Sequence, residues 1–241
     1  IYRLRKEGYR KIWYLADGIY SIHGNFCDVK GLHQLLDEEE DFYAYLDDAH
    51  GIGWTGKYGC GFVIGTYGLH EKMIVAASFC KSFAGAGGGL VVPDRETAEM
   101  LKYTGQTMIF SGPVQPPMQG VLVASSKLHL SDELPPLQHE LGELIRFFRK
   151  RSEELGLPVL TKDESPIQLL KTGSMENLQK VQDHLISNGF LTTTAGYPAI
   201  SRGDEGIRIS ITRALSNDDI NSLLTCLKDF MTSENFEFKN A

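Results

Sequence analysis

Four short apolar runs in the first half of the chain constrain the fold more than any other sequence feature. Each has the length of one buried strand, and segments with helical spacing separate them, such as Leu32, Leu35 and Leu36. Strands that alternate with helices predict an α/β fold in which helices cover a parallel or mixed sheet. The predicted strands are residues 12–16, 42–46, 73–77 and 89–92.

The pattern changes in the second half. Helical spacing over residues 115–130 and 137–148 is followed by short apolar runs at 167–170, 190–194 and 207–211. Two further helices are predicted at 175–188 and 216–232. A length of 241 residues allows one large or two small domains. We therefore predict part of a large domain over residues 1–130 and a small α+β domain over residues 131–241.

Composition narrows the classes of function. The chain has 24 basic and 31 acidic residues, a net charge of −7, which argues against a nucleic-acid partner. No apolar run approaches the ~20 residues that span a membrane. The four cysteines include no C-x-x-C pair, so we expect no metal site, reduced thiols and a cytoplasmic protein.

Polar residues follow two of the predicted strands. Asp47, Asp48 and His50 come after the second, and Ser78 and Lys81 after the third. Ligands of open α/β sheets bind beyond the carboxyl ends of the strands. The many glycines between residues 51 and 89 indicate tight loops near a ligand. A lysine in such a cleft can serve as a nucleophile or a base.

Two of these features leave alternatives open. Ser78 and Lys81 have the S-x-x-K spacing of serine β-lactamases, and Lys171-Thr172-Gly173 has their K-T-G pattern. That chemistry needs a helix, which the glycines after Phe83 disfavour. Arg208 lies on an otherwise apolar strand. Its guanidinium would form either a structural ion pair or a clamp that binds a carboxylate.

Several motifs together resemble the α-oxoamine synthase family of pyridoxal-phosphate enzymes of fold type I. The family includes aminooxononanoate synthase, aminolevulinate synthase, aminoketobutyrate ligase and serine palmitoyltransferase. The motifs are YLADGIYSIHG at 14–24, DDAHGIG at 47–53, SFCKSF at 78–83, FSGP at 110–113 and GIRIS at 206–210. The resemblance implies the rear part of a fold-type-I large domain, with a mixed, mostly parallel sheet, followed by the small domain.

The resemblance also implies roles for single residues. Lys81 would hold pyridoxal phosphate and later act as the base that removes the α-proton of the substrate. Asp47 would pair with the pyridine nitrogen, and His50 would contact the phenolic oxygen side of the ring. These three residues are the expected catalytic group.

Further cofactor and substrate contacts follow from the same resemblance. Ser78 would bind the phosphate, and Ser21 would lie beside the substituents of the ring. Ser111 would reach the phosphate of a neighbouring subunit, so we expect a homodimer with shared active sites. Arg208 would bind the carboxylate of the amino-acid substrate.

The implied reaction condenses glycine, alanine or serine with an acyl-coenzyme A, with loss of carbon dioxide and coenzyme A. The alternatives are an aminotransferase of the same fold, an inactive fragment and, more remotely, a serine hydrolase using Ser78 and Lys81. Family members carry a long segment before the first motif. We therefore expect this chain to be the C-terminal portion of such an enzyme, with an uncovered sheet face when alone.

Overall fold

The computed structural model describes residues 1–234 and 236, and the chain folds as two units. The first unit comprises Ile1–Ile19 and Phe26–Pro135, and the second comprises Tyr20–Asn25 and Pro136–Ala241. The division after Pro135 lies five residues beyond the boundary predicted from the sequence. No sequence pattern predicted that Tyr20–Asn25 belongs to the second unit.

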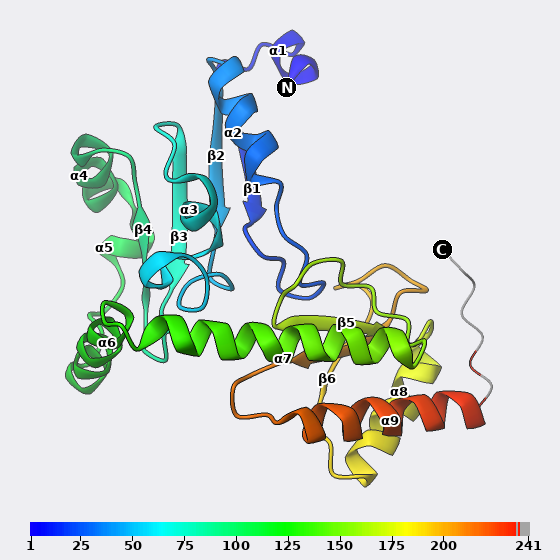
Figure 1. Ribbon diagram of the computed structural model, residues 1–241. Helices are drawn as coiled ribbons and strands as arrows, with labels where there is room; N and C mark the ends of the chain where they lie inside the picture. Colours follow the sequence, from blue (N-terminus) through cyan, green and yellow to red (C-terminus); the bar gives the residue numbers. More distant parts are fainter. Residues whose placement is uncertain (235, 237–241) are drawn as a thin grey trace. The chain divides into compact units, whose positions relative to one another are not determined.

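The first unit is built on a four-stranded sheet in the order β1-β2-β3-β4 (Figure 1). Its strands are β1 (Ile12–Asp17), β2 (Phe42–Asp47), β3 (Met73–Ser78) and β4 (Gly88–Val91). The first three are parallel and β4 is antiparallel to β3, so the predicted mixed, mostly parallel sheet is confirmed. Parallel neighbours need crossover connections. The helices α2 (Val29–Glu38) and α3 (Phe62–Tyr67) lie within these connections.

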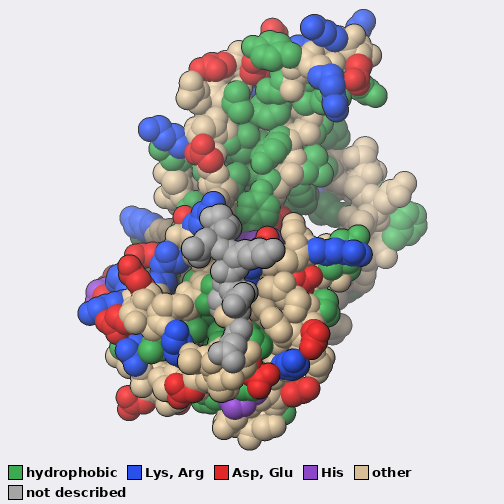
Figure 2. Space-filling view, turned by 90° about the vertical axis from the view of Figure 1, so that its right-hand side faces the viewer, with side chains coloured by type: hydrophobic (Ala, Val, Ile, Leu, Met, Phe, Trp, Pro, Cys, Tyr) green, Lys and Arg blue, Asp and Glu red, His purple; other side chains and the backbone are tan. Residues whose placement is uncertain are grey.

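One face of this sheet carries the core of the first unit. Leu32 and Leu36 of α2 and Val63 of α3 belong to one buried cluster with the alternate strand residues Phe42, Ala44, Leu46, Met73 and Val75. On the opposite face, Trp13 stacks on Tyr43, and Leu15 is 69% exposed. Figure 2 shows hydrophobic side chains gathered on the side of this unit that faces the viewer.

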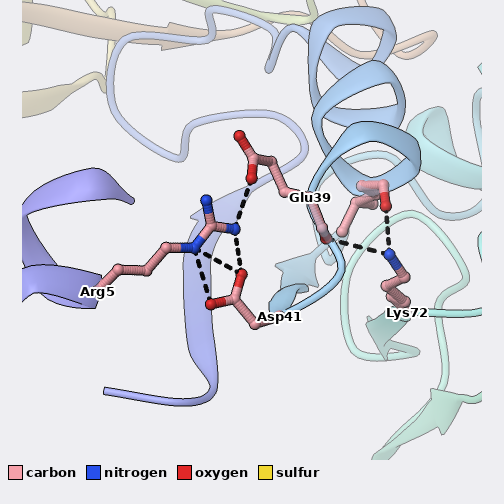
Figure 3. Close-up of polar contacts among 5 residues, drawn as sticks. Arg5, Glu39, Asp41 and Lys72 are labelled. Atoms are coloured by element: carbon pink, nitrogen blue, oxygen red, sulfur yellow. Dashed lines mark hydrogen bonds and ion pairs between the residues drawn. The ribbon is translucent and has the colours of Figure 1, made fainter. Parts of the chain in front are cut away.

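An ionic network joins the elements at the end of the sheet where β1 and β2 begin (Figure 3). Arg5 of α1 (Tyr2–Lys6) pairs with Glu39 and Asp41, and its guanidinium lowers the pKa of Asp41. Lys72 donates from Nζ to the backbone oxygens of Leu36, at 2.6 Å, and Glu39, at 3.1 Å. A cation in this place donates to carbonyl groups at the end of α2, where the hydrogen bonds within the helix stop.

The rest of the first unit is helical. It contains η1 (Lys57–Gly59), α4 (Arg95–Thr104), α5 (Gln106–Ile109) and α6 (Pro116–His129). The helix predicted at 115–130 is confirmed by α6. The short helices α1, α3, α4 and α5 were not predicted, because six residues or a weakly apolar face give little periodic signal.

The second unit contains a three-stranded antiparallel sheet in the order β5-β7-β6. Its elements are β5 (Ile167–Lys171), β6 (Thr193–Ala195), β7 (Gly206–Ser210), α8 (Met175–Ser187), α9 (Asn217–Ser233) and most of α7 (Leu134–Glu154). This confirms the predicted α+β character. Within the described residues, no helix is both long and apolar enough to span a membrane.

The strand predicted at 190–194 is wrong in its first half, because β6 begins only at Thr193. Gly189 has a φ of +86°, and the amide of Phe190 donates to the carbonyl of Leu185 at 2.9 Å. These residues form the left-handed turn that closes α8. They are therefore unavailable to the sheet.

Candidate active site

The two polar clusters predicted from the sequence lie at one edge of the first sheet. Asp47 is the last residue of β2, and Ser78 is the last residue of the parallel neighbour β3. The strand register places Asp47 beside Ala76, two residues before Ser78. Parallel strands end at the same edge, so the loops after β2 and β3 start side by side.

Lys81 and His50 meet above this edge. The turn after β3 carries Lys81, and its Nζ lies 2.7 Å from Nε2 of His50 in the loop after β2. A lysine ammonium has only donors, so Nε2 accepts in this contact when the amine is charged. Lys81 is exposed and His50 is half-buried. The arrangement presents a primary amine to solvent beside an imidazole nitrogen that can accept a hydrogen bond from it.

Asp47 and Ser78 are turned into their own loops. Asp47 is exposed, and its Oδ1 accepts a hydrogen bond from the amide of Ala49 at 2.8 Å. The Oγ of Ser78 accepts from the amide of Cys80 at 3.3 Å. The first contact holds the start of the loop that leads to His50, and the second holds the start of the turn that leads to Lys81. Oδ2 of Asp47 and the hydroxyl proton of Ser78 remain for other partners.

Asp48 is fully buried, whereas the adjacent Asp47 is exposed. Its Oδ2 accepts from the amide of Val63 at 3.0 Å, and its Oδ1 has no hydrogen-bond partner among the described residues. Loss of water around the carboxylate raises its pKa to about 7, although the amides of Val63 and Phe62 act in the opposite direction. Asp48 therefore fastens the start of the loop to the beginning of α3.

Three glycines make room for this carboxylate. A Cβ at Gly18, Gly51 or Gly61 would lie 2.7, 2.2 or 2.2 Å from an oxygen of Asp48, closer than atoms can approach. Gly61 also has a φ of +97°. All three positions need glycine for space, and Gly61 needs it for its conformation as well. The glycines between residues 51 and 89 were predicted to form tight loops near a ligand. In the structure, Gly51 and Gly61 of that stretch enclose Asp48 together with Gly18, which follows β1.

Arg208 and Ser21 come together in the second unit. Nε of Arg208 donates to the backbone oxygen of Ser21 at 2.7 Å, and its Nη1 donates to Oγ of Ser210 at 2.8 Å. No carboxylate among the described residues lies within ion-pair distance of Arg208, so the structural ion pair considered above is not formed. Burial lowers the pKa of this guanidinium, as expected for a cation without a counter-ion.

Ser111 is not joined to the other predicted residues. It is exposed, and its Oγ donates to the carbonyl of Met108 at 3.2 Å. In the described part of the chain, no polar contact links it to Lys81. The residues before it, Met108, Ile109 and Phe110, are all exposed, with Phe110 at 86%.

The geometry required by the serine-hydrolase alternative is not formed. Ser78 ends β3, and residues 79–84 form a turn rather than a helix. Ser78 and Lys81 are thus not one helical turn apart on a common helix. The described residues also contain no cluster of three or more His, Cys, Asp or Glu side chains that suits a metal ion.

Sequence reasoning assigned no role to three residues that shape this site. Asp48 was named only as part of a motif, although its buried carboxylate fastens the loop after β2 to the start of α3. Ser82 donates from Oγ to the carbonyl of Ile52 at 3.0 Å, and buried His129 of α6 lies 3.2 Å from the carbonyl oxygen of Gly53. Ser82 lay inside a recognised motif. His129 carried no sequence signal beyond being a lone histidine on a predicted helix.

Comparison with known proteins gives a consistent family. Residues 3–227 match the family described as aminotransferase class I and II. Among curated relatives, 8-amino-7-oxononanoate synthase from Symbiobacterium thermophilum is 29% identical over 90% of this chain and 54% of its own length. Serine palmitoyltransferase 3 from Homo sapiens is 25% identical over 93% of this chain and 41% of its own length. The chain thus spans about half the length of the curated relatives it matches.

Solved structures show the same fold. A serine palmitoyltransferase from S. paucimobilis has a TM-score of 0.82 at 20% identity, covering 92% of this chain and 55% of that one. The 8-amino-7-oxononanoate synthase from Francisella tularensis has a TM-score of 0.79 at 22% identity, covering 97% and 67%. The predicted α/β fold type and the predicted resemblance to the α-oxoamine synthases are confirmed. The prediction that the chain belongs to an enzyme family of the transferase type is confirmed with them.

Proposed function

Because the chain belongs to the aminotransferase class I and II family, we propose that it supplies the reactive lysine of a pyridoxal-phosphate-dependent acyltransferase. The enzyme condenses a small α-amino acid (glycine, alanine or serine) with an acyl-coenzyme A and releases carbon dioxide and coenzyme A. The observation that carries the proposal is the 2.7 Å contact between Lys81 Nζ and His50 Nε2 at the sheet edge where Asp47 also lies.

The residues at this edge suit pyridoxal phosphate. The group supplies an electron-withdrawing ring that stabilises negative charge on the α-carbon of a bound amino acid. Lys81 offers an exposed amine for the aldehyde, and Asp47 offers an exposed carboxylate for a protonated ring nitrogen. Ser78 offers a hydroxyl proton for the phosphate. These three groups come from the ends of two adjacent parallel strands, so they share one edge.

Lys81 and His50 handle protons in this proposal. Nζ of Lys81 takes the α-proton of the substrate once the amine is free of the cofactor. Nε2 of His50, 2.7 Å away, accepts a hydrogen bond from the resulting ammonium and holds it in place. The exposed position of Lys81 leaves room for the amino acid beside it.

Arg208 binds the carboxylate of the amino acid. The guanidinium is half-buried, it is held by the Ser21 carbonyl and the Ser210 hydroxyl, and it lacks a carboxylate partner among the described residues. A desolvated guanidinium with free donors favours a bidentate carboxylate. Ser21 has its backbone oxygen engaged with Arg208, so its hydroxyl remains the group available to the cofactor ring.

The proposed reaction exchanges one bond of the thioester for a carbon–carbon bond. The α-carbon, after losing its proton to Lys81, attacks the acyl carbon of the thioester. The carbon–sulfur bond breaks, and the thiolate of coenzyme A leaves with the electron pair. The carboxylate of the amino acid then departs as carbon dioxide, and a proton takes its place on the α-carbon.

An aminotransferase is the second candidate, because the matched family is described as aminotransferase class I and II. Such an enzyme uses the same lysine, aspartate and arginine. It would differ in transferring the amino group to a keto acid, without condensation to an acyl group. The relatives reported above favour the synthase, since by name one is an oxononanoate synthase and the other a palmitoyltransferase, and neither is an aminotransferase.

We also infer a homodimer with shared active sites and a cytoplasmic location. The exposed apolar residues Met108, Ile109 and Phe110 support an interface with a second copy. Ser111, which follows them, would then serve the phosphate of the neighbouring subunit. The four cysteines are free thiols, which suits a reducing compartment.

The test uses the full-length protein with pyridoxal phosphate. Borohydride should fix a phosphopyridoxyl mass on the peptide that contains Lys81, and Lys81→Ala should remove it. Lys57→Ala, at an exposed lysine of the neighbouring glycine loop, is the matched control and should keep it. A thiol-trapping dye should then report release of coenzyme A with glycine, alanine or serine and short or long acyl chains. Label on another lysine would refute the cofactor site, and amino transfer without thiol release would establish the aminotransferase.

A further inference from the structure

A buried histidine outside all the recognised motifs connects the two loops of the site. His129 is the last residue of α6 and is 6% exposed. Its ring stacks on that of Phe83, with centroids 4.5 Å apart and an interplanar angle of 23°. Phe83 is only two residues beyond Lys81. The histidine therefore packs directly against the segment that carries the lysine.

The other side of the same ring reaches the loop that carries His50. Nε2 of His129 lies 3.2 Å from the carbonyl oxygen of Gly53, and Nδ1 lies 2.8 Å from the carbonyl oxygen of Ser125. Carbonyl oxygens only accept hydrogen bonds, so a ring nitrogen that bonds to either carbonyl must carry a hydrogen. A neutral ring donates to one of these carbonyls, and a protonated ring donates to both. Gly53 is three residues beyond His50.

Ser125 adds a second link to the same segment. One turn before His129 on α6, its Oγ donates to the carbonyl oxygen of Phe83 at 2.7 Å. The end of α6 therefore contacts both the ring and the backbone carbonyl of Phe83, and it contacts the backbone carbonyl of Gly53. The two loops also contact each other directly, where Oγ of Ser82 donates to the carbonyl oxygen of Ile52 at 3.0 Å.

The glycines of the loop fit this arrangement. A Cβ at Gly59 would lie 2.5 Å from Cδ2 of His129, and Gly59 has a φ of +67°. A Cβ at Gly53 would lie 3.1 Å from the backbone nitrogen of Phe83. The loop backbone thus lies directly against the imidazole and the lysine segment. Any larger residue at Gly59 would displace the ring.

We propose that His129 is a positioning residue that sets the distance between His50 and Lys81 by clamping Gly53 and Phe83 to the end of α6. The inference rests on the proposed function only in taking Lys81 as the reactive lysine. His129 touches neither reacting group, so it acts through the two loops. Displacing reacting groups by about 1 Å can cost roughly a hundredfold in rate.

The test compares His129→Phe with the parent in the full-length protein. Phenylalanine keeps a flat ring for the stack on Phe83 but has no N–H for Gly53. His139→Phe is the matched control, since the side chain of His139 on α7 is 72% exposed. Gly59→Ala serves as a second variant, because its Cβ would press against Cδ2 of the same ring.

The first readout is amide hydrogen exchange in the cofactor-free protein. The amides of Gly53 and Gly61 are bonded within the loop, to the carbonyls of Gly59 and Thr55. Loss of one hydrogen bond that holds the loop should speed exchange in peptides covering 51–61 and 79–87 by about five- to tenfold. Peptides from α2 should keep the parent rate, as should all peptides of the control variant. Unchanged exchange in both loops, or equal acceleration in α2, would overturn the proposal.

The second readout is the reactivity of the Lys81 amine. Trace acetylation followed by peptide mass analysis gives the ratio of Lys81 to exposed Lys30, which lies on α2. Separation from His50 should raise this ratio by about fivefold in His129→Phe. An unchanged ratio would refute the link to Lys81. Neither readout needs cofactor or substrate, so the result stands apart from the success or failure of the proposed function. With cofactor and substrates, kcat should fall while the amino-acid KM stays near that of the parent.

Discussion

Replacement of Asp48 by asparagine should change how the stability of the protein depends on pH. The carboxyl has an ordinary pKa of 3.8, and burial raises it to about 7 in the folded chain. Between these values the folded state binds a proton that the unfolded state has lost. The free energy of unfolding therefore falls as pH rises, by about 1.4 kcal/mol for each pH unit and by roughly 4 kcal/mol in all.

Asparagine removes this titration and keeps much of the geometry. Its side-chain oxygen can still accept from the amide of Val63, while its NH₂ group takes the place of an oxygen that has no partner among the described residues. An unpaired buried donor costs about 1–3 kcal/mol at every pH. Asp48→Asn should therefore be less stable than the parent at pH 4.5. Between pH 4.5 and pH 8.5 the parent should lose roughly 3 kcal/mol of stability that Asp48→Asn keeps, so the difference between the two proteins should change by that amount.

Urea unfolding between pH 4.5 and 8.5, followed by tryptophan fluorescence, measures this difference. Both tryptophans of the chain, Trp13 and Trp54, lie in the same unit as Asp48. Asp132→Asn is the control, because Asp132 is exposed in that unit. Its stability should follow that of the parent at every pH. A constant difference between parent and Asp48→Asn over the whole range would refute the buried-carboxylate argument.

Three further substitutions have defined outcomes. Arg208→Gln should raise the KM for the amino acid by tenfold or more with a smaller change in kcat, because only the carboxylate clamp is lost; steady-state kinetics measure both, and an unchanged KM would remove Arg208 from the substrate site. Gly61→Ala should destabilise the protein by about 2 kcal/mol or more in urea unfolding, because it combines a φ of +97° with a 2.2 Å clash against Asp48. Lys72→Met should lower the free energy of unfolding by about 1–2 kcal/mol, because the carbonyl of Leu36 loses its side-chain donor and that of Glu39 keeps only the amide of Phe42; an unchanged value would show that water replaces the ammonium fully.

The sequence predicted the framework of the site because strand signals are local. Five-residue apolar runs identified β1, β2 and β3, and parallel strands must end at a common edge. The strand pattern alone therefore placed Asp47, His50 and Lys81 in the same region of the molecule. The short helix α3 was not predicted, because six residues between two glycines are too few to show a helical period.

Contacts within the site could not be predicted in the same way. Asp47 and Asp48 are adjacent and chemically identical, yet one is exposed and the other fully buried, because the chain turns inward beneath α3 directly after β2. The 2.7 Å contact of Lys81 depends on a turn in which Ala84 has a φ of +58°. Such turns depend on what packs against them, here His129 and Ser125 of a helix more than 40 residues further along the chain.

The assignment of Tyr20–Asn25 to the second unit has a consequence for the order in which the protein can be made. The chain passes from one unit to the other three times, after Ile19, Asn25 and Pro135. The early hexapeptide leaves the ribosome well over a hundred residues before its partners. The carbonyl of His23 then accepts from Thr161 at 2.6 Å, and that of Ser21 accepts from Arg208 at 2.7 Å.

The second unit therefore cannot be completed by its own contiguous sequence. A fragment that begins at residue 136 would lack the carbonyl of Ser21, which orients Arg208. It would also lack Gly24, which packs closely against the backbone of Ile167. Contacts between residues so distant in the chain form late and slow the overall folding reaction. The guanidinium proposed to bind substrate thus becomes oriented only after Arg208 itself has been synthesised, long after Ser21.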